Sequence, residues 1–343
     1  MINTKALREK ILDLAMRGKL VPQDPTDEPA SVLLDKIKEE KEQLIKDKKI
    51  KKEKPLPKIS KEEIPYEIPD SWEWVRLVDI GSIFSGGTPK TTINGFWENG
   101  TIPWITPAIM GKSKSKIFNS VVLKHITEQG LNCSSAQLIP GRSIVYSSRA
   151  PIGHINIVPY PYSTNQGCKS VTPIKVDINY LYYCLVFRTP DIQNRASGTT
   201  FKEISGKGFR MTCISIPPLK EQKRIVAKIE ELFALIDTIE SNQLEFKQLA
   251  EQLDKKILDL AMHGKLVPQD PTDEPASVLL DKIKEEKEQL IKDKKIKKEK
   301  PLPEISKEEI PYEIPYEIPD SWEWGYLGSI STKIQYGYTD SAK

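Results

Sequence analysis

Residues 217–264 read PPLKEQKRIVAKIEELFALIDTIESNQLEFKQLAEQLDKKILDLAMHG and constrain the architecture more than any other segment. Their apolar positions alternate steps of three and four residues over about five heptads, which is the spacing of a coiled-coil seam. Prolines precede the pattern and Gly264 follows it, as expected at helix ends. We therefore predict one helix of ~44 residues, about 65 Å long. The pattern includes Leu249, and the residues expected to contact a partner helix are Ile225, Ile229, Leu232, Ile236, Ile239, Phe246, Leu253, Ile257 and Leu260.

The chain carries a long internal repeat. Residues 11–69 recur at 257–315 with two substitutions, Arg17 to His263 and Lys58 to Glu304. The second copy then duplicates YEIP, and both copies resume with PDSWEW. One interpretation is a recent duplication without functional meaning. The other is that two equal surfaces are required, so that the chain holds two copies of one partner, as symmetric assemblies favour.

The N-terminal segment is a copy of the far end of the predicted long helix. Leu7, Ile11 and Leu14 align with residues 253, 257 and 260 of that helix. A helix this short cannot bury its apolar stripe alone, so we expect it to pack on the long helix of this chain or of another. A Pro-rich loop and a second helical stripe follow, ending in KDKKIKKEK. Because acidic residues are interleaved there, we interpret that run as a solvated helix end rather than a phosphate-binding surface.

The segment between the two copies differs in charge and pattern. Residues 70–216 carry 15 Lys+Arg and 8 Asp+Glu, whereas the whole chain has a net charge of only +3. A local basic excess is typical of nucleic-acid binders, although alone it is weak evidence. Short β-type runs such as SIVYSS and HINIVPY are separated by Gly, Pro, Asn and Ser, and residues 180–196 favour a helix. The predicted fold class is therefore α+β, a globular domain joined to long coiled-coil-type helices.

Several classes of function are disfavoured by composition and motifs. The longest apolar run, YLYYCLVF, is far shorter than the ~18–20 residues of a membrane span. The N-terminus has no apolar signal core, so we expect a cytoplasmic protein that contacts no membrane. The four cysteines and three histidines show no metal-ligand spacing, so no metal site is expected. GxGxxG, Walker, HExxH and GxSxG motifs are all missing, which lowers the odds of an enzyme.

Six ordered motifs carry a family resemblance. They are IPDSWEWVRLVDIGSIFSGGTPKT, GTIPWITPAIM, LIPGRSIVYSSRAPIGHINI, STNQGCKSVTP, GTTFKEISG and IPPLKEQKRIVAKIEELFALID. In this order they resemble a target-recognition domain followed by the conserved helix of a type I restriction–modification specificity subunit. The resemblance covers essentially the whole chain, because the repeated flanks are similar to that family's conserved regions.

The resemblance implies a non-catalytic subunit that reads double-stranded DNA. In that family the helices hold two methyltransferase subunits, and restriction/translocase subunits join that core. S-adenosylmethionine, ATP and Mg would then be bound by partner subunits, with no cofactor in this chain. Two recognition domains lie at opposite ends of paired antiparallel helices in the family, and each reads half of a split target.

The chain departs from the family pattern because it has one complete recognition domain. After the second flank it continues only with GYLGSISTKIQYGYTDSAK (Gly325 to Lys343), which resembles the start of a second recognition domain, cut short. We therefore expect a half-sized or truncated subunit that forms a homodimer through the long helices. The predicted domains are an N-terminal conserved region at 1–69, a target-recognition domain at 70–216, the long helix at 217–263, the repeat of the N-terminal region at 264–324 and the truncated start at 325–343. The alternatives are a DNA-modifying enzyme with unrecognised chemistry and a coiled-coil adaptor that binds protein.

Reading DNA requires hydrogen-bond donors for base edges and cations for phosphates. The candidate contacts in the recognition domain are polar loop residues: Thr88, Lys90, Lys112, Lys114, Lys116, Ser148, Arg149, Asn165, Gln166, Thr199, Thr200, Lys202, Lys207 and Arg210. Among them we expect Arg149, Asn165 and Gln166 to read bases, because Arg pairs bidentately with guanine and Asn or Gln with adenine. The GKSKSK run suits a phosphate clamp. Two alternatives stay open: Asn165 could instead stabilise a turn, and Arg149 could pair with a carboxylate.

Overall fold

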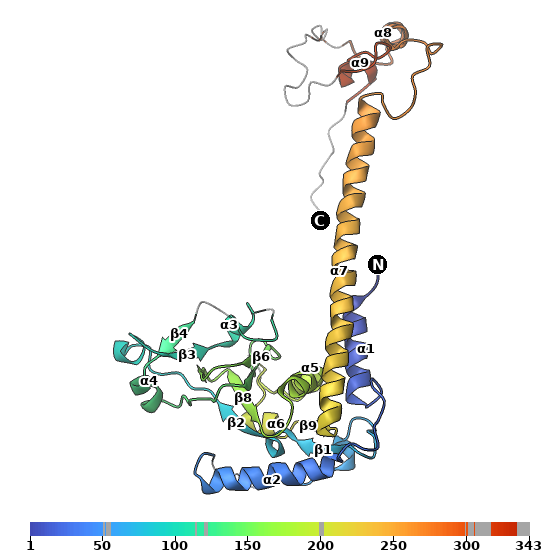
Figure 1. Ribbon diagram of the computed structural model, residues 1–343. Helices are drawn as coiled ribbons and strands as arrows, with labels where there is room; N and C mark the ends of the chain where they lie inside the picture. Colours follow the sequence, from blue (N-terminus) through green and yellow to red (C-terminus); the bar gives the residue numbers. More distant parts are fainter. Residues whose placement is uncertain are drawn as a thin grey trace. The chain divides into compact units, whose positions relative to one another are not determined.

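The computed structural model describes residues 1–334, except 51, 53–55, 114, 120–122, 199–201, 299, 301–304 and 306–316. The chain divides into two compact units, Met1–Glu240 and Ser241–Lys343, and the division falls within the long helix. The helices are α1 (Thr4–Met16), α2 (Ala30–Lys46), α3 (Pro107–Met110), α4 (Glu128–Asn132), α5 (Ile178–Asn194), α6 (Gly206–Arg210), α7 (Leu219–Met262), α8 (Ala276–Lys292) and α9 (Leu327–Ile330). Figure 1 shows these elements along the chain. Helix α7 and helix α5 confirm the two helices predicted from residues 217–264 and 180–196.

The recognition domain of the first unit is built on three small sheets. The strands are β1 (Glu73–Arg76), β2 (Gly81–Ser85), β3 (Ile102–Ile105), β4 (Lys124–Ile126), β5 (Ser143–Ser147), β6 (Ile155–Val158), β7 (Ser163–Thr164), β8 (Cys168–Pro173) and β9 (Cys213–Ile216). Their orders are β2-β8-β5-β6, β4-β3-β7 and β1-β9, and all the ladders are antiparallel except β3 with β7. With helices alongside these sheets, the α+β class is confirmed.

Helix α1 packs on the first half of α7, which confirms that the short N-terminal helix packs on the long helix. Asn3 caps α1 by accepting a hydrogen bond from the Ala6 amide, at 3.0 Å. The helix then buries Leu12 and Met16 in the main core, which also takes in α5 and the start of α7. Arg8 near the start of α1 pairs with Asp237 late in this half of α7, at 2.5 Å, so the two helices run antiparallel (Figure 1).

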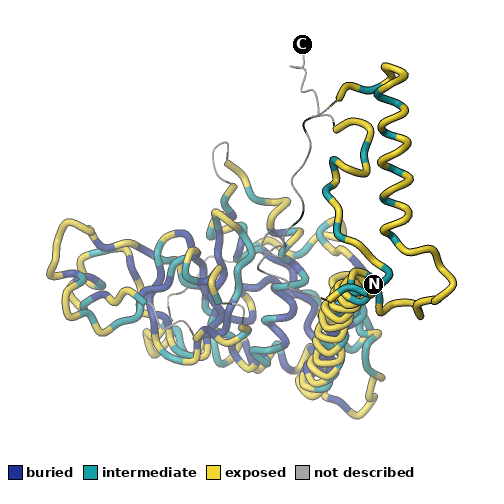
Figure 2. The backbone as a smooth tube through the Cα atoms, turned by 90° about the horizontal axis from the view of Figure 1, so that it is seen from above, coloured by how far each residue is buried: buried dark blue, intermediate teal, exposed yellow. Residues whose placement is uncertain are grey.

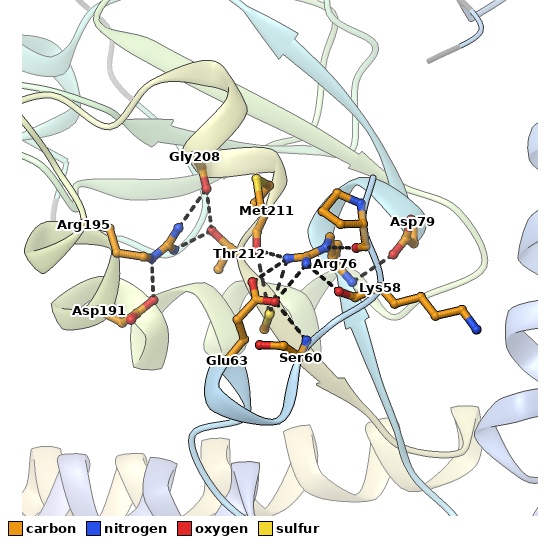
Figure 3. Close-up of polar contacts among 12 residues, drawn as sticks. Lys58, Ser60, Glu63, Arg76, Asp79, Asp191, Arg195, Gly208, Met211 and Thr212 are labelled. Carbon is orange, nitrogen blue, oxygen red and sulfur yellow. Dashed lines mark hydrogen bonds and ion pairs between the residues drawn. The ribbon is translucent and has the colours of Figure 1, made fainter. Parts of the chain in front are cut away.

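A buried arginine joins the segment before the recognition domain to the domain itself (Figure 3). The guanidinium of Arg76 in β1 donates to both carboxylate oxygens of Glu63, at 3.0 and 3.1 Å. It also donates to the backbone oxygens of Pro57 and Met211. The hydrogen bonds from Arg76 to Glu63 lower the pKa of the Glu63 carboxyl. Because a guanidinium in an apolar interior is stable only when its donors are paired, this clamp fixes residues 57–63 against β1 and β9.

The second copy of the repeat reproduces the internal contacts of the first. In the first copy the Ala30 amide donates to the Ser71 oxygen at 3.0 Å, and Lys36 pairs with Glu28 at 2.7 Å. In the second copy the Ala276 amide donates to Ser321 at 2.9 Å, and Lys282 pairs with Glu274. The near-identical sequence therefore folds twice into the same local module.

The seam of α7 is buried only along its first half. Ile225, Ile229 and Ile236 are buried, whereas the seam residues that follow Glu240 are mostly exposed. Phe246 is the extreme case, with 73% of its surface exposed. Figure 2 shows the second unit as largely exposed, whereas the recognition domain contains buried, intermediate and exposed segments. Contiguous exposed apolar residues of this kind mark surfaces that bind another chain.

Candidate nucleic-acid interface

Loops from four parts of the recognition domain meet beside the β2-β8-β5-β6 sheet. Three backbone hydrogen bonds fasten them: Gly87 donates to Thr164 at 2.8 Å, Ser148 to Gly167 at 2.8 Å, and the Ile204 amide to the Ser148 oxygen at 3.0 Å. The approach is closest at Gly86, where a Cβ atom would lie 1.8 Å from the backbone oxygen of Asn165. A side chain at that position would therefore push these loops apart.

Arg149, Lys169 and Glu203 form the charged centre of these joined loops. The Glu203 carboxylate lies 3.9 Å from an Arg149 nitrogen and 3.8 Å from the Lys169 ammonium. Backbone pairing between Arg149 and Glu203 holds the acid in place. Lys169 is buried, and burial lowers its pKa, while its ammonium also donates to the backbone oxygen of Gln166 at 3.2 Å. The side chain of Arg149 is about one-third exposed, so a ligand can reach it.

Arg149 therefore pairs with a carboxylate, which is one of the two alternatives left open by the sequence. Its side chain nevertheless remains partly exposed to solvent. Glu203 was not among the contacts predicted from the sequence. The sequence feature that could have indicated Glu203 is its position in the motif GTTFKEISG, directly after the predicted contact Lys202. Only the fold shows that Lys169 and Arg149 converge on this carboxylate from separate loops.

Asn165 and Gln166 occupy different environments in the β7–β8 connection. The Asn165 side-chain oxygen accepts a hydrogen bond from the Gly167 amide at 3.0 Å, which is the turn-stabilising contact left open above. Gln166 is exposed, and its side-chain oxygen accepts a hydrogen bond from the Thr88 hydroxyl. Gln166 and Thr88 are thus presented together at the surface, whereas part of the Asn165 side chain serves the turn.

The buried floor under these loops is polar. Among the described residues, the hydroxyls of Ser148, Ser163 and Thr164 are buried without a hydrogen-bond partner. Such groups are destabilising unless a rearrangement or a bound molecule satisfies them. The burial of Ser148 disfavours direct contact between its hydroxyl and DNA, so its role as a contact stays a prediction.

The predicted phosphate contacts are dispersed over the domain. Lys90, Lys112, Lys202 and Lys207 are exposed. Lys116 instead pairs with Glu230 of α7 and lies 5.4 Å from the centre of the Tyr183 ring, so it tethers its loop to the helix side of the unit. Arg210 lines a groove beside α2. Lys114, Thr199 and Thr200 lie outside the described residues.

Other kinds of site find little support in the described part of the chain. Within it, no three His, Cys, Asp or Glu side chains are grouped so that they could hold a metal ion. Cys168 and Cys184 are buried, and burial raises the pKa of each thiol to about 12, which makes them inert thiols at neutral pH. No described helix is both long enough and apolar enough to cross a membrane.

Comparison with known proteins identifies the family. Residues 69–247 match the family described as the type I restriction modification DNA specificity domain, and this match covers more than half of the chain. The chain belongs to this family. The resemblance found in the six motifs is thereby confirmed, and the matched residues contain all the joined loops described above.

Relatives in the specificity-domain family extend the likeness beyond the matched domain. The chain is 37% identical to the type I restriction enzyme EcoAI specificity subunit of Escherichia coli, over 95% of this chain and 62% of that protein. It is 33% identical to the EcoEI specificity subunit of Escherichia coli, over 98% of this chain and 63% of that protein. The chain thus spans a little under two thirds of the length of these relatives. A solved HsdS subunit from Thermoanaerobacter tengcongensis aligns with a TM-score of 0.45 at 20% identity, over 77% of this chain and 57% of that one.

Proposed function

We propose that this chain is a non-catalytic DNA sequence-recognition subunit of a type I restriction–modification complex. It reads one half of a split target through residues 70–216 and scaffolds methyltransferase subunits, through which restriction/translocase subunits join. S-adenosylmethionine, ATP and Mg bind to those partners. The observation that carries the proposal is the family match over residues 69–247, which contains the joined polar loops.

The joined loops supply the two kinds of contact that DNA reading needs. Arg149 and Gln166 offer donors that fit guanine and adenine edges in the major groove. Exposed lysines elsewhere on the domain, such as Lys90 and Lys112, offer charge to phosphates without reading sequence. A base-reading centre with exposed cations outside it is the arrangement that separates specificity from affinity.

Two substitutions separate base reading from phosphate binding. Lys112→Ala should weaken binding to specific and random DNA alike and reduce the salt slope of the binding constant by ~1. Arg149→Ala should cost about 1–3 kcal/mol on the specific site and relax the preference at one position of the target. Binding titrations over a range of salt concentrations, with a randomised oligonucleotide library, measure both effects. Equal losses on specific and random DNA for Arg149→Ala would contradict its role as a base reader.

The target itself is found by sequencing methylated sites in DNA modified by the chain together with its methyltransferase. A split palindrome indicates that two copies of this one recognition domain read the site. Methylation or cleavage of DNA by the purified chain alone would instead support the enzyme alternative.

We also propose that two chains pair through the exposed second half of α7. Phe246, Leu249 and Leu253 continue the seam that α1 covers on the first half, and they are at least half exposed. Sedimentation at several concentrations should show a dimer for the unmodified chain and a monomer for Phe246→Glu combined with Leu253→Glu. The matched control is Lys247→Glu, at an exposed position beside the seam. A strict monomer in the presence of DNA and methyltransferase contradicts pairing.

A further inference from the structure

A groove lies between α2 and the first strands of the recognition domain, on the first unit. Its volume is about 1200 Å³, and we call it the α2 groove. Leu34, Lys38 and Ile45 form its helical wall, and Val75 and Ile83 belong to the opposite wall. Leu34 and Ile45 are partly exposed although they are apolar. The groove therefore presents an apolar floor that is open to a partner.

The second copy of the repeat forms the same groove on the second unit. This α8 groove has a volume of about 440 Å³ and is lined by Leu280, Lys284 and Ile291, which occupy the repeat positions of Leu34, Lys38 and Ile45. A matching lysine contact closes one side of both grooves. Lys41 donates to the backbone oxygen of Val78, and Lys287 donates to that of Gly328 at 2.6 Å.

The helical wall is the same in the two grooves, whereas the strand side differs. On the strand side, Val75 and Val78 of the α2 groove correspond to Gly325 and Gly328 of the α8 groove. A ligand that binds both grooves would therefore recognise the side chains of α2 and α8, which are identical. A surface that occurs twice in one chain fits a partner that binds in two copies.

The charges on the grooves indicate the chemistry of the occupant. Five basic and three acidic side chains line the α2 groove, and four basic and two acidic side chains line the α8 groove. An apolar floor with a basic margin is complementary to an amphipathic segment whose apolar residues are flanked by carboxylates.

We propose that the α2 and α8 grooves each bind one acidic, amphipathic segment of a methyltransferase subunit. This inference rests on the proposed function, because it names the surface by which the scaffolded partner is held. Apolar side chains of the segment enter between Ile45 and the strand wall, and its carboxylates face Lys38. The same contacts recur at Ile291 and Lys284.

Paired variants of the full chain test each groove separately. Lys38→Glu with Ile45→Asp alters the α2 groove, and Lys284→Glu with Ile291→Asp alters the α8 groove. Each pair should lower the amount of methyltransferase bound per chain at saturation to about half, and the four changes together should abolish binding. Native mass spectrometry of the chain with the methyltransferase subunit measures the ratio. Controls that reverse a lysine charge outside the grooves are Lys46→Glu and Lys292→Glu, which lie in the last turns of α2 and α8 and line neither groove.

The readouts distinguish failure of this inference from failure of the proposed function. All variants should keep the circular dichroism and the DNA affinity of the unmodified chain, since neither groove contains the joined loops around Arg149. Variants that retain the full amount of methyltransferase overturn the inference while the proposed function stands. An unmodified chain that binds no methyltransferase overturns both. Loss of DNA affinity in the groove variants, with methyltransferase binding intact, would show that the grooves bind DNA instead.

Discussion

Leu33 and Leu279 occupy the same position in two helices of identical sequence, α2 and α8, yet their surroundings differ. Leu33 is 3% exposed, whereas Leu279 is 55% exposed. Both helices have the same length and the same exposed lysine–glutamate pair. The local sequence thus determines the helix, and the neighbouring recognition domain determines whether its apolar face is buried.

The same contrast appears in a polar contact. In both copies a serine donates to a glutamine side chain, Ser71 to Gln23 at 3.3 Å and Ser321 to Gln269 at 3.2 Å. In the first copy, Glu221 from the first turn of α7 completes the contact by accepting hydrogen bonds from Gln23 at 2.5 Å and from the Trp72 indole at 3.0 Å. Burial raises the pKa of Glu221. The hydrogen bond between serine and glutamine thus forms in both copies, whether or not a carboxylate joins it.

The largest difference in stability between the two copies is expected for substitutions on the apolar faces of α2 and α8. Leu33→Ala should lower the free energy of unfolding of the first unit by about 2–5 kcal/mol, because it leaves a cavity in a buried core. Leu279→Ala should change the free energy of unfolding of the second unit by no more than ~0.5 kcal/mol, because that side chain is mostly solvated. Urea denaturation followed by tryptophan fluorescence measures both. Equal effects would mean that α8 is also covered in solution, for instance by the proposed second chain, and dilution would then separate the two values.

The next largest difference concerns the indole donor. Trp72→Phe keeps an aromatic ring but leaves the buried Glu221 with one hydrogen-bond donor fewer, so it should cost about 1–3 kcal/mol. Trp322→Phe changes the aligned residue, which is 39% exposed, and should stay within ~0.5 kcal/mol. Denaturation at pH 7 tests the pair. The Trp72 loss should shrink at low pH, where Glu221 is protonated and the missing donor matters less. A loss that is independent of pH would assign the effect to packing alone.

The periodic parts of the fold were predictable from the sequence, because their signals are local. The seam of α7 follows from spacings of three and four residues, and the match of α1 to the far end of α7 follows from the repeat. The seam does not say which of its residues are covered. Ile229 is buried and Phe246 is exposed although both are seam residues, since burial depends on α1 and α5, which are distant in sequence.

The candidate site was predicted in part, for a similar reason. The motifs located the loops that carry Thr88, Arg149 and Gln166, which the fold brings together. Glu203 was missed, and the ion pair of Lys116 was not predicted, because ion pairs between distant segments depend on tertiary structure. Lys116 looked like part of a basic run, but its partner Glu230 is 114 residues away along the chain.

A smaller difference is expected from the Arg76 clamp, since the aligned residue of the second copy is Tyr326. The hydrogen bonds from Arg76 lower the pKa of Glu63 from 4.5 in the folded chain. The stabilisation is therefore present above about pH 4.5 and is lost as the pH falls through the lowered pKa. Because Glu63 is about one-third exposed, solvent screening limits the contribution to about 1 kcal/mol. Glu63→Gln should remove this loss on acidification, whereas the exposed control Glu67→Gln should retain it; an unchanged acid profile in Glu63→Gln would contradict the clamp.

The smallest effect, and the sharpest check on the comparison, comes from the ion pair that both copies share. Lys36 pairs with Glu28 and Lys282 pairs with Glu274, and all four side chains are about half exposed or more. Exposed pairs contribute roughly 0.2–1 kcal/mol and are screened by salt. Lys36→Ala and Lys282→Ala should therefore give equal, small losses in double-mutant cycles with the partner glutamates, and both should fade at 1 M salt. Unequal coupling energies would mean that the recognition domain also affects the solvent-exposed face of α2. The two copies would then differ on their exposed faces as well as in the burial of their apolar faces.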